Sequence, residues 1–215
     1  MMKTAPAIVP PHEIAAEAFA LASSILPPPI LNHSLRVYFY ARTLAEERQL
    51  PYAGDGKNHL LFTACIMHDS GCAAQFDGPQ RFEVEGADAA TALLRKSGTV
   101  NENDIHQVWT AIALHTSPGI AERISEFARL VREAVLIDFK KDKALRDIYG
   151  DEGARRLVSK IEDLYPRLEV EKILGDCVVD QAKRRPEKAP APSWPGLLYR
   201  AALDNPTWEG VNKAF

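Results

Sequence analysis

Cysteine is scarce in this chain, with three residues among 215. Cys65, Cys72 and Cys177 are odd in number and widely spaced, so the sequence indicates neither a disulfide framework nor a zinc-finger pattern. The chain also lacks any apolar run near the roughly 18 residues that a membrane-spanning helix needs. Its first residues contain no apolar stretch of the signal-peptide kind. These absences lead us to expect a cytoplasmic protein.

An excess of positive charge is missing as well. Lysine and arginine number 26 against 29 aspartates and glutamates, which gives a formal net charge of −3. Such a chain has no electrostatic footprint for nucleic acid or for an anionic membrane. We therefore expect a small-molecule substrate as the partner, with a homo-oligomeric state left open. A hydrophobic share of 46% over 215 residues is typical of one globular domain with a full core.

Helical periodicity runs through the chain, and no segment shows the strict alternation of a convincing strand. The sequence therefore predicts an all-α fold, a compact helical bundle. The expected helices cover residues 12–24, 32–49, 60–67, 82–96, 101–115, 121–143, 151–164 and 169–185.

Proline marks the boundaries of the predicted domains. Pro27, Pro28 and Pro29 predict an extended link after the first helix, and residues 186–195 predict a proline-rich linker or surface strap. The expected organisation is a helix with a proline-rich lead-in at 1–29, a helical domain at 30–185, and a proline-rich tail packed on that domain at 186–215.

A His-Asp pair, His68 and Asp69, closes the apolar helix of residues 60–67. Adjacent side chains can reach one cation only where the backbone leaves regular helix, and Gly71 is expected to permit that turn. The pair alone is weak evidence, because any surface turn can contain it. Its significance depends on whether ligand-type residues point the same way from other helices.

Four expected helices carry an apolar stripe that begins or ends with an imidazole or a carboxylate. Residues spaced three and four apart share one helix face, which here should face the core. The stripes are formed by His33, Val37, Tyr40 and Leu44; by Leu61, Cys65 and His68; by Ile105, Val108, Ile112 and His115; and by Ile124, Ala128, Val131, Val135 and Asp138.

A single histidine on an apolar face is more often a hydrogen-bonded core residue than a ligand. Asp138 is harder to explain in that way, because a buried carboxylate without a partner costs several kcal/mol. A shared cation is a more economical explanation than separate structural roles. His33, His68, Asp69 and Asp138 would offer two nitrogen and two carboxylate ligands, a set that suits Zn²⁺, Fe²⁺, Mn²⁺ or Co²⁺. His115 would be a further ligand or an acid–base group.

The order His33, His68-Asp69, Asp138 on an all-helical chain resembles the HD-domain metalloenzyme superfamily. The resemblance covers roughly residues 30–140. It implies a compact helical core that binds a divalent metal and is usually hydrolytic.

Three longer sequence segments resemble the cyanamide hydratase family. Enzymes of that family add water to cyanamide to give urea, with zinc in an HD-type site. This resemblance implies His33, His68, Asp69 and Asp138 as metal ligands, and catalytic roles for Asp69 and for His115 in the pocket. The implied reaction is attack of a metal-bound hydroxide on the nitrile of cyanamide or a similar small compound. The matching phrases are LNHSLRVY at 31–38, RFEVEGADAA at 81–90 and AIALHTSPGI at 111–120.

One departure separates the chain from many HD phosphohydrolases. Those enzymes continue the pair as HDxGK, whose lysine can serve phosphate binding, whereas Cys72 stands at that position here. Arg36 and Arg81 remain candidate phosphate partners, so a phosphohydrolase acting on a nucleotide or other phosphate ester is the alternative function. A metal-binding but non-catalytic HD module is a third hypothesis. Glu83 and Glu85, within a matched phrase, are either acidic first-turn residues or direct participants.

Overall fold

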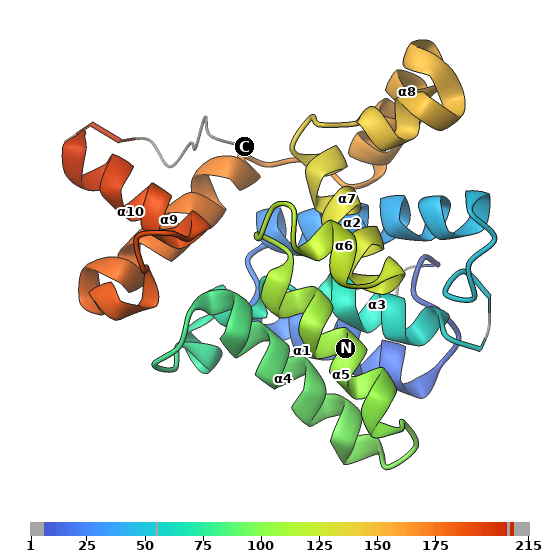
Figure 1. Ribbon diagram of the computed structural model, residues 1–215, viewed down its shortest axis with the longest axis horizontal. Coiled ribbons are helices and arrows are strands. Elements are labelled where there is room, and N and C mark those ends of the chain that lie inside the picture. The colour runs from blue at the N-terminus through green and yellow to red at the C-terminus, as the bar shows by residue number, and fades with distance from the viewer. Residues whose placement is uncertain (1–6, 55, 206, 209–215) are drawn as a thin grey trace.

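The computed structural model describes residues 7–54, 56–205 and 207–208. The described residues form helices and loops and contain no strand, which confirms the all-α prediction (Figure 1). The outer ends of the predicted lead-in and tail, residues 1–6 and 209–215, lie outside the described residues, and the domain boundaries themselves stay a prediction. The α-helices are α1 (Glu13–Ile25), α2 (Pro28–Glu47), α3 (Asn58–Met67), α4 (Phe82–Ser97), α5 (Glu102–Leu114), α6 (Ala121–Ile124), α7 (Glu126–Asp138), α8 (Lys143–Leu164), α9 (Val170–Arg184) and α10 (Trp194–Asp204).

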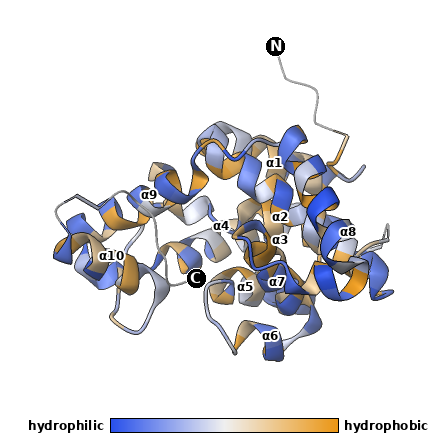
Figure 2. Ribbon diagram, turned by 90° about the horizontal axis from the view of Figure 1, so that it is seen from above, coloured by the Kyte–Doolittle hydropathy of each residue, from blue (hydrophilic) through white to orange (hydrophobic). Residues whose placement is uncertain are grey.

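Helix α3 is the centre of the bundle. It packs against α1, α2, α4, α5 and α7, and Figure 2 shows it as a largely hydrophobic element among these neighbours. Nearly all of its side chains are buried, which is the pattern of a helix that is apolar all round. The residues that follow α3 are therefore delivered into the middle of the protein, and His68 and Asp69 are the first of them.

The proline run begins a helix, contrary to the predicted extended link. Pro27 is extended, with φ −65° and ψ 152°, and α2 starts directly at Pro28. Proline is well suited to the first turn of a helix, because its missing N–H would have no partner there and its φ is already helical. Asn32, where the sequence placed the start of this helix, lies inside it and donates a hydrogen bond from Nδ2 to the carbonyl oxygen of Pro166, at 2.9 Å.

The predicted long helix over residues 121–143 is divided into α6 and α7. Ser125 separates them with an extended backbone (φ −163°, ψ 158°), and its side chain accepts a hydrogen bond from the amide of Ala128. Serine is a strong helix N-cap, so a new helix starts here. Ile124, assigned to the buried stripe, is 54% exposed as a result.

The C-terminal part of the chain lies beside the bundle. In Figure 1, α9 and α10 project on one side and α8 on the other. Helix α10 starts within the predicted proline-rich tail and packs against α9. Trp194 and Trp208 pack against a small cluster that contains Phe82 and Leu198. Among the described residues, no helix combines the length and the apolar character needed to cross a membrane.

Candidate metal centre

Three imidazoles meet the carboxylate of Asp69 in the middle of the bundle. His33 comes from α2, while His68 and His115 are the residues at which α3 and α5 end. The Nε2 atoms of His33 and His68 lie 3.1 Å apart and 3.5 and 3.3 Å from Oδ2 of Asp69. Nε2 of His115 lies 3.5 Å from Oδ1 of the same carboxylate. All four side chains are buried.

Hydrogen bonds on the far side of each ring determine the tautomer of the three histidines. His68 and His115 each place Nδ1 2.7 Å from the carbonyl oxygen three residues earlier in the chain. His33 places Nδ1 2.6 Å from Oδ2 of Asp138. Since carbonyl and carboxylate oxygens only accept, Nδ1 carries the proton in each ring. Each Nε2 therefore directs a lone pair towards Asp69.

This arrangement fits a cation. Burial, with the neighbouring imidazoles, lowers the pKa of His68 to about 3, so this ring is uncharged near neutral pH. Both oxygens of Asp69 are buried and have no hydrogen-bond partner among the described residues. Acceptor atoms that face one another without a donor are costly, and a shared cation removes that cost.

The ends of two helices also favour a cation at this position. The C-terminal ends of α3 and α5 lie at the group, because His68 and His115 directly follow the last residues of these helices, Met67 and Leu114. A helix C-terminus carries partial negative charge and favours a nearby cation. Within the described residues, His33, His68 and Asp69 have ligand atoms close enough together to hold one metal ion.

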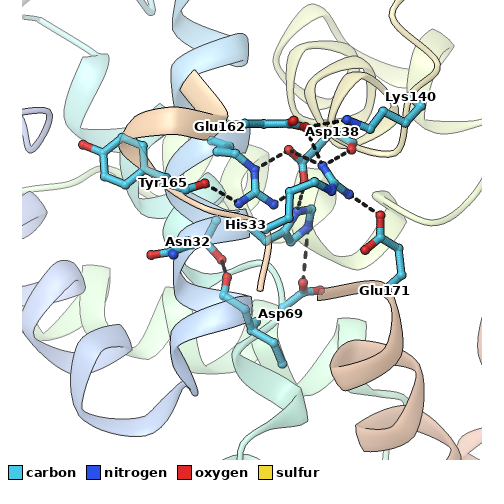
Figure 3. Close-up of polar contacts among 12 residues, drawn as sticks. Asn32, His33, Asp69, Asp138, Lys140, Glu162, Tyr165 and Glu171 are labelled. Carbon is cyan, nitrogen blue, oxygen red and sulfur yellow. Dashed lines mark hydrogen bonds and ion pairs between the residues drawn. The ribbon is translucent and has the colours of Figure 1, made fainter. Parts of the chain in front are cut away.

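Asp138 contacts His33, but it is not among the residues whose ligand atoms lie close enough together to share one ion, whereas the sequence led us to expect it as a fourth ligand. Figure 3 shows His33 between Asp138 on one side and Asp69 on the other. Arg36 donates to both oxygens of Asp138, from Nε at 2.7 Å and from an Nη atom at 2.8 Å. The charge of this buried carboxylate is thus neutralised by an arginine, which removes the electrostatic argument for direct ligation. Burial would raise the pKa of Asp138, but Arg36 and His33 hold it below its usual value.

In this structure Asp138 orients a ligand. By accepting from Nδ1 of His33, it keeps the Nε2 lone pair of that ring pointing at Asp69. Carboxylates in this position commonly hold metal-binding histidines in place. The sequence contains one signal for the Arg36 pairing, because Arg36 follows His33 by three residues and so shares its helix face.

Gly71 serves a purpose other than the one expected. The backbone leaves the helix at Asp69 (φ −101°, ψ 8°), as predicted, but Gly71 has no positive φ. It lies in the 3₁₀ turn η1 (Ser70–Cys72), where a Cβ atom would be 1.9 Å from the carbonyl oxygen of Phe82. Glycine is required here for close packing of the turn on α4, and this packing holds Asp69 at its place.

Two residues left open by the sequence now have partners. Glu83 is fully buried and accepts hydrogen bonds from Oγ1 of Thr116, at 2.6 Å, and from Arg81. Glu85 accepts from the backbone N–H of Gln80, at 2.7 Å. Glu83 therefore secures the residue after His115, whereas Glu85 closes a local turn.

Cys72 lies near the group but is a poor nucleophile. Burial and the charge of Asp69 raise the pKa of its thiol well above the usual value. A thiol that stays protonated reacts slowly, because the thiolate is the reactive form. The structure gives Cys72 no part in the chemistry.

Comparison with known proteins agrees with this geometry at the level of the family. The family model of the HD domain matches residues 30–137, which include His33, His68, Asp69 and His115 and end one residue before Asp138. Among curated proteins, none matches the chain closely enough to count as a relative. Because the matched segment makes up half of the chain and carries the His-His-Asp group, the protein belongs to the HD domain family, whose membership implies metal-dependent chemistry of the hydrolase type.

Proposed function

We propose that this protein is a metal-dependent hydratase that adds water to the nitrile of cyanamide, or of a similar small nitrile-like compound, to give urea. The observation that carries the proposal is that both candidate phosphate-binding arginines already form ion pairs with carboxylates of the protein. Arg36 is bound to Asp138, and Arg81 is bound to Glu83. With Cys72 in place of the lysine of HDxGK, a phosphate would meet little free positive charge, whereas a neutral nitrile needs none.

The burial of the candidate metal ligands and of His115 favours a substrate whose reacting group is narrow. His33 and His68 are 0% exposed, Asp69 is 1% exposed and His115 is 2% exposed. A nitrile is linear, so its carbon can approach through a narrow opening. A tetrahedral phosphate is wider and carries charge that must be desolvated.

His33, His68 and Asp69 would hold the metal ion, for which Zn²⁺ is our first choice. When bound, such an ion lowers the pKa of a water ligand towards neutrality and so supplies the nucleophile. Asp138 and Arg36 keep His33 in the ligating orientation, and the buried surroundings exclude bulk water.

His115 is the group placed to move a proton. Its Nδ1–H is held by a backbone carbonyl, so Nε2 accepts a proton from the attacking water and returns it to the nitrile nitrogen. Asp69, 3.5 Å from this nitrogen, stabilises the imidazolium formed in between. The water oxygen forms a bond to carbon as a carbon–nitrogen π bond breaks. A second proton shift from oxygen to nitrogen then gives urea.

The test is urea release from cyanamide by the purified protein, with metal content measured on the same sample. Activity that is lost on chelation and restored by Zn²⁺ is expected. A fully metal-loaded protein that forms no urea would overturn the proposal.

A His115→Gln substitution should separate proton transfer from metal binding. We expect kcat to fall by about 100-fold or more, in line with the usual contribution of general acid–base catalysis, while the bound metal is retained. His106→Gln, on an exposed face of the same helix, is the matched control and should keep wild-type kcat. Unchanged kcat in His115→Gln would remove this residue from the mechanism.

A phosphohydrolase is the second candidate, and one observation favours it. A cleft of about 440 Å³ near His115 is large enough for a nucleotide and includes Arg81, Arg132 and Lys141 in its lining. Phosphate release from a panel of nucleotides by the metal-loaded protein, without urea formation from cyanamide, would establish this alternative.

A further inference from the structure

The cleft of about 440 Å³ is lined in part by residues that surround His115. Thr116, in its lining, follows His115 in the chain and donates a hydrogen bond to the buried Glu83. Arg132, also in the lining, donates from an Nη atom to the carbonyl oxygen of His115, at 2.9 Å. The cleft therefore shares two wall residues with the surroundings of the proposed proton-transfer group.

The outer walls of the cleft are apolar. Pro118 and Ile120, in the segment after α5, form one wall, and Pro192, Trp194 and Leu197 at the start of α10 form the other. Ile120 is 55% exposed and Leu197 is 50% exposed. Large apolar side chains left open to solvent on both sides of a concavity are typical of a binding site for an apolar group.

The C-terminal wall is tied to the metal centre by a series of ring contacts. The Trp194 and Phe82 rings have centroids 5.8 Å apart, the Phe82 and His115 rings 5.7 Å, and the His115 and His68 rings 4.8 Å. Trp194 and Leu197 lie beyond the matched HD domain, which ends at residue 137. This wall is thus an addition to the family's matched core, at a position next to its catalytic centre.

The charges inside the cleft argue against an anionic occupant. Arg132 is paired with Glu122, and Arg81 is paired with Glu83. Lys141 is the remaining cation of the lining, and it is exposed, so that solvent screens its charge. An uncharged apolar group makes use of these walls without displacing either buried ion pair.

We infer that the substrate is a substituted cyanamide or nitrile whose uncharged, apolar substituent lies between Ile120 and the Trp194–Leu197 wall while its nitrile reaches the metal centre. The inference rests on the proposed function. Cyanamide itself, N≡C–NH₂, is far smaller than the cleft and would leave the apolar walls without contacts. The residues of α10 then determine specificity rather than the chemical step.

The first test compares kcat/KM for cyanamide and for benzylcyanamide with the metal-loaded, full-length protein. We expect the substituted compound to be preferred, by roughly fourfold for each buried methylene equivalent. Trp194→Ala and Leu197→Ala should lower the ratio of the two kcat/KM values by about tenfold. Leu197 is half exposed, so its substitution tests the site even where loss of Trp194 disturbs folding. Leu203→Ala, 63% exposed on the same helix and outside the cleft lining, is the control and should keep the wild-type ratio.

The second test measures binding without turnover, by calorimetric titration with benzylurea, the corresponding product. Binding that weakens about tenfold in Leu197→Ala and is unchanged in Leu203→Ala supports the assignment, even in a protein that hydrates no nitrile and so fails the proposed function. Urea formation at equal kcat/KM from both cyanamides, unaffected by either wall substitution, overturns the inference and leaves the proposed function standing. Displacement of benzylurea by a nucleoside monophosphate that is then hydrolysed overturns both.

Discussion

Asp69 and Asp138 are both buried carboxylates of the HD signature, but their surroundings differ. Asp138 accepts from Arg36 and His33, whereas the Asp69 oxygens face imidazole nitrogens and have no hydrogen-bond partner among the described residues. The charge of Asp138 is neutralised by its arginine partner. Asp69 has no such partner, so a bound cation would neutralise its charge. At the scale of single residues, the signature thus separates into a proposed metal ligand, Asp69, and a group that orients His33, Asp138.

An Asp138→Asn substitution should weaken metal binding without abolishing it. The amide oxygen can still accept from Nδ1 of His33, but the ring loses a charged partner, and such changes typically cost 10- to 100-fold in metal affinity. His68→Ala removes a ligand outright and should leave no stoichiometric metal. Calorimetric titration of the metal-free variants with Zn²⁺ compares the two, with His106→Gln as the unaffected control.

Equal loss of metal in Asp138→Asn and His68→Ala would show that Asp138 ligates directly. The sequence predicted that role because a buried aspartate needs a partner, and it identified no arginine for the purpose. Arg36 and Asp138 are 102 positions apart, on helices whose packing is not visible in any local pattern. The inward direction of His33, His68 and His115 was visible, since helical spacing alone places them on apolar stripes.

At the scale of elements, the turn η1 depends on close contact with the first turn of α4. A Cβ atom at Gly71 would lie 1.9 Å from the carbonyl oxygen of Phe82, and the backbone there cannot move aside cheaply. Gly71→Ala should therefore destabilise the protein by about 3 kcal/mol, at the upper end of the usual cost of overpacking. Urea denaturation measures this. Gly54→Ala, with no atom within 4 Å of the added methyl group, is the control, and an equal effect in both variants would contradict the packing argument.

The C-terminal elements are held to the bundle by Asp77. Its carboxylate accepts from Nζ of the buried Lys188, at 2.7 Å, and from Arg184, at 2.9 Å. Asp77→Asn leaves Lys188 without its charged partner and should cost about 3 kcal/mol, as breaking a buried ion pair does. We expect hydrogen exchange to accelerate in residues 186–204, and unchanged protection there would show that other contacts hold α10.

The same pair predicts a dependence on pH. Burial would raise the pKa of Asp77, but Lys188 and Arg184 lower it below its usual value. The unfolded chain then binds the proton more readily, so this stabilisation is complete above the unfolded pKa, about 4, and is lost as pH falls through the folded value. The stability difference between wild type and Asp77→Asn should be constant near neutrality and shrink below about pH 4. A difference that persists at lower pH would exclude the ionised pair as its source.

Element boundaries show where sequence reasoning succeeds and where it stops. The expected helix start at residue 101 agrees with a local capping preference, because the Asn101 side chain accepts from the amide of Asp104. Gly98 ends α4 in the left-handed conformation that glycine favours. Ser125 was passed over because the apolar spacing continues across it, although its capping preference outweighs that continuity. The place of Trp194 beside the cleft could not be predicted, since no local pattern shows which surface a tail will contact.

At the scale of the whole molecule, the metal centre joins segments that are remote in the chain. His33, His68 and His115 come from α2 and from the ends of α3 and α5, so a bound ion connects the central helix to two of its neighbours. An ion that binds the folded chain only stabilises it by about 4 kcal/mol when present at roughly 1,000 times its Kd. In a protein of this size, each kcal/mol shifts the Tm by about 2–4 °C.

Chelation should therefore lower the Tm of the wild-type protein by roughly 8–16 °C, and added Zn²⁺ should restore it. The physical reason is that removing the ion leaves the Asp69 oxygens and the facing imidazole nitrogens buried without a partner. The His68→Ala protein binds no ion, so its Tm should be insensitive to the chelator. Scanning calorimetry of both proteins, with and without chelator, makes the comparison. An equal drop in the Tm of His68→Ala would show that the stabilising ion binds elsewhere. An unchanged Tm in the wild type would show that the buried His and Asp residues are stable in the fold without a metal ion.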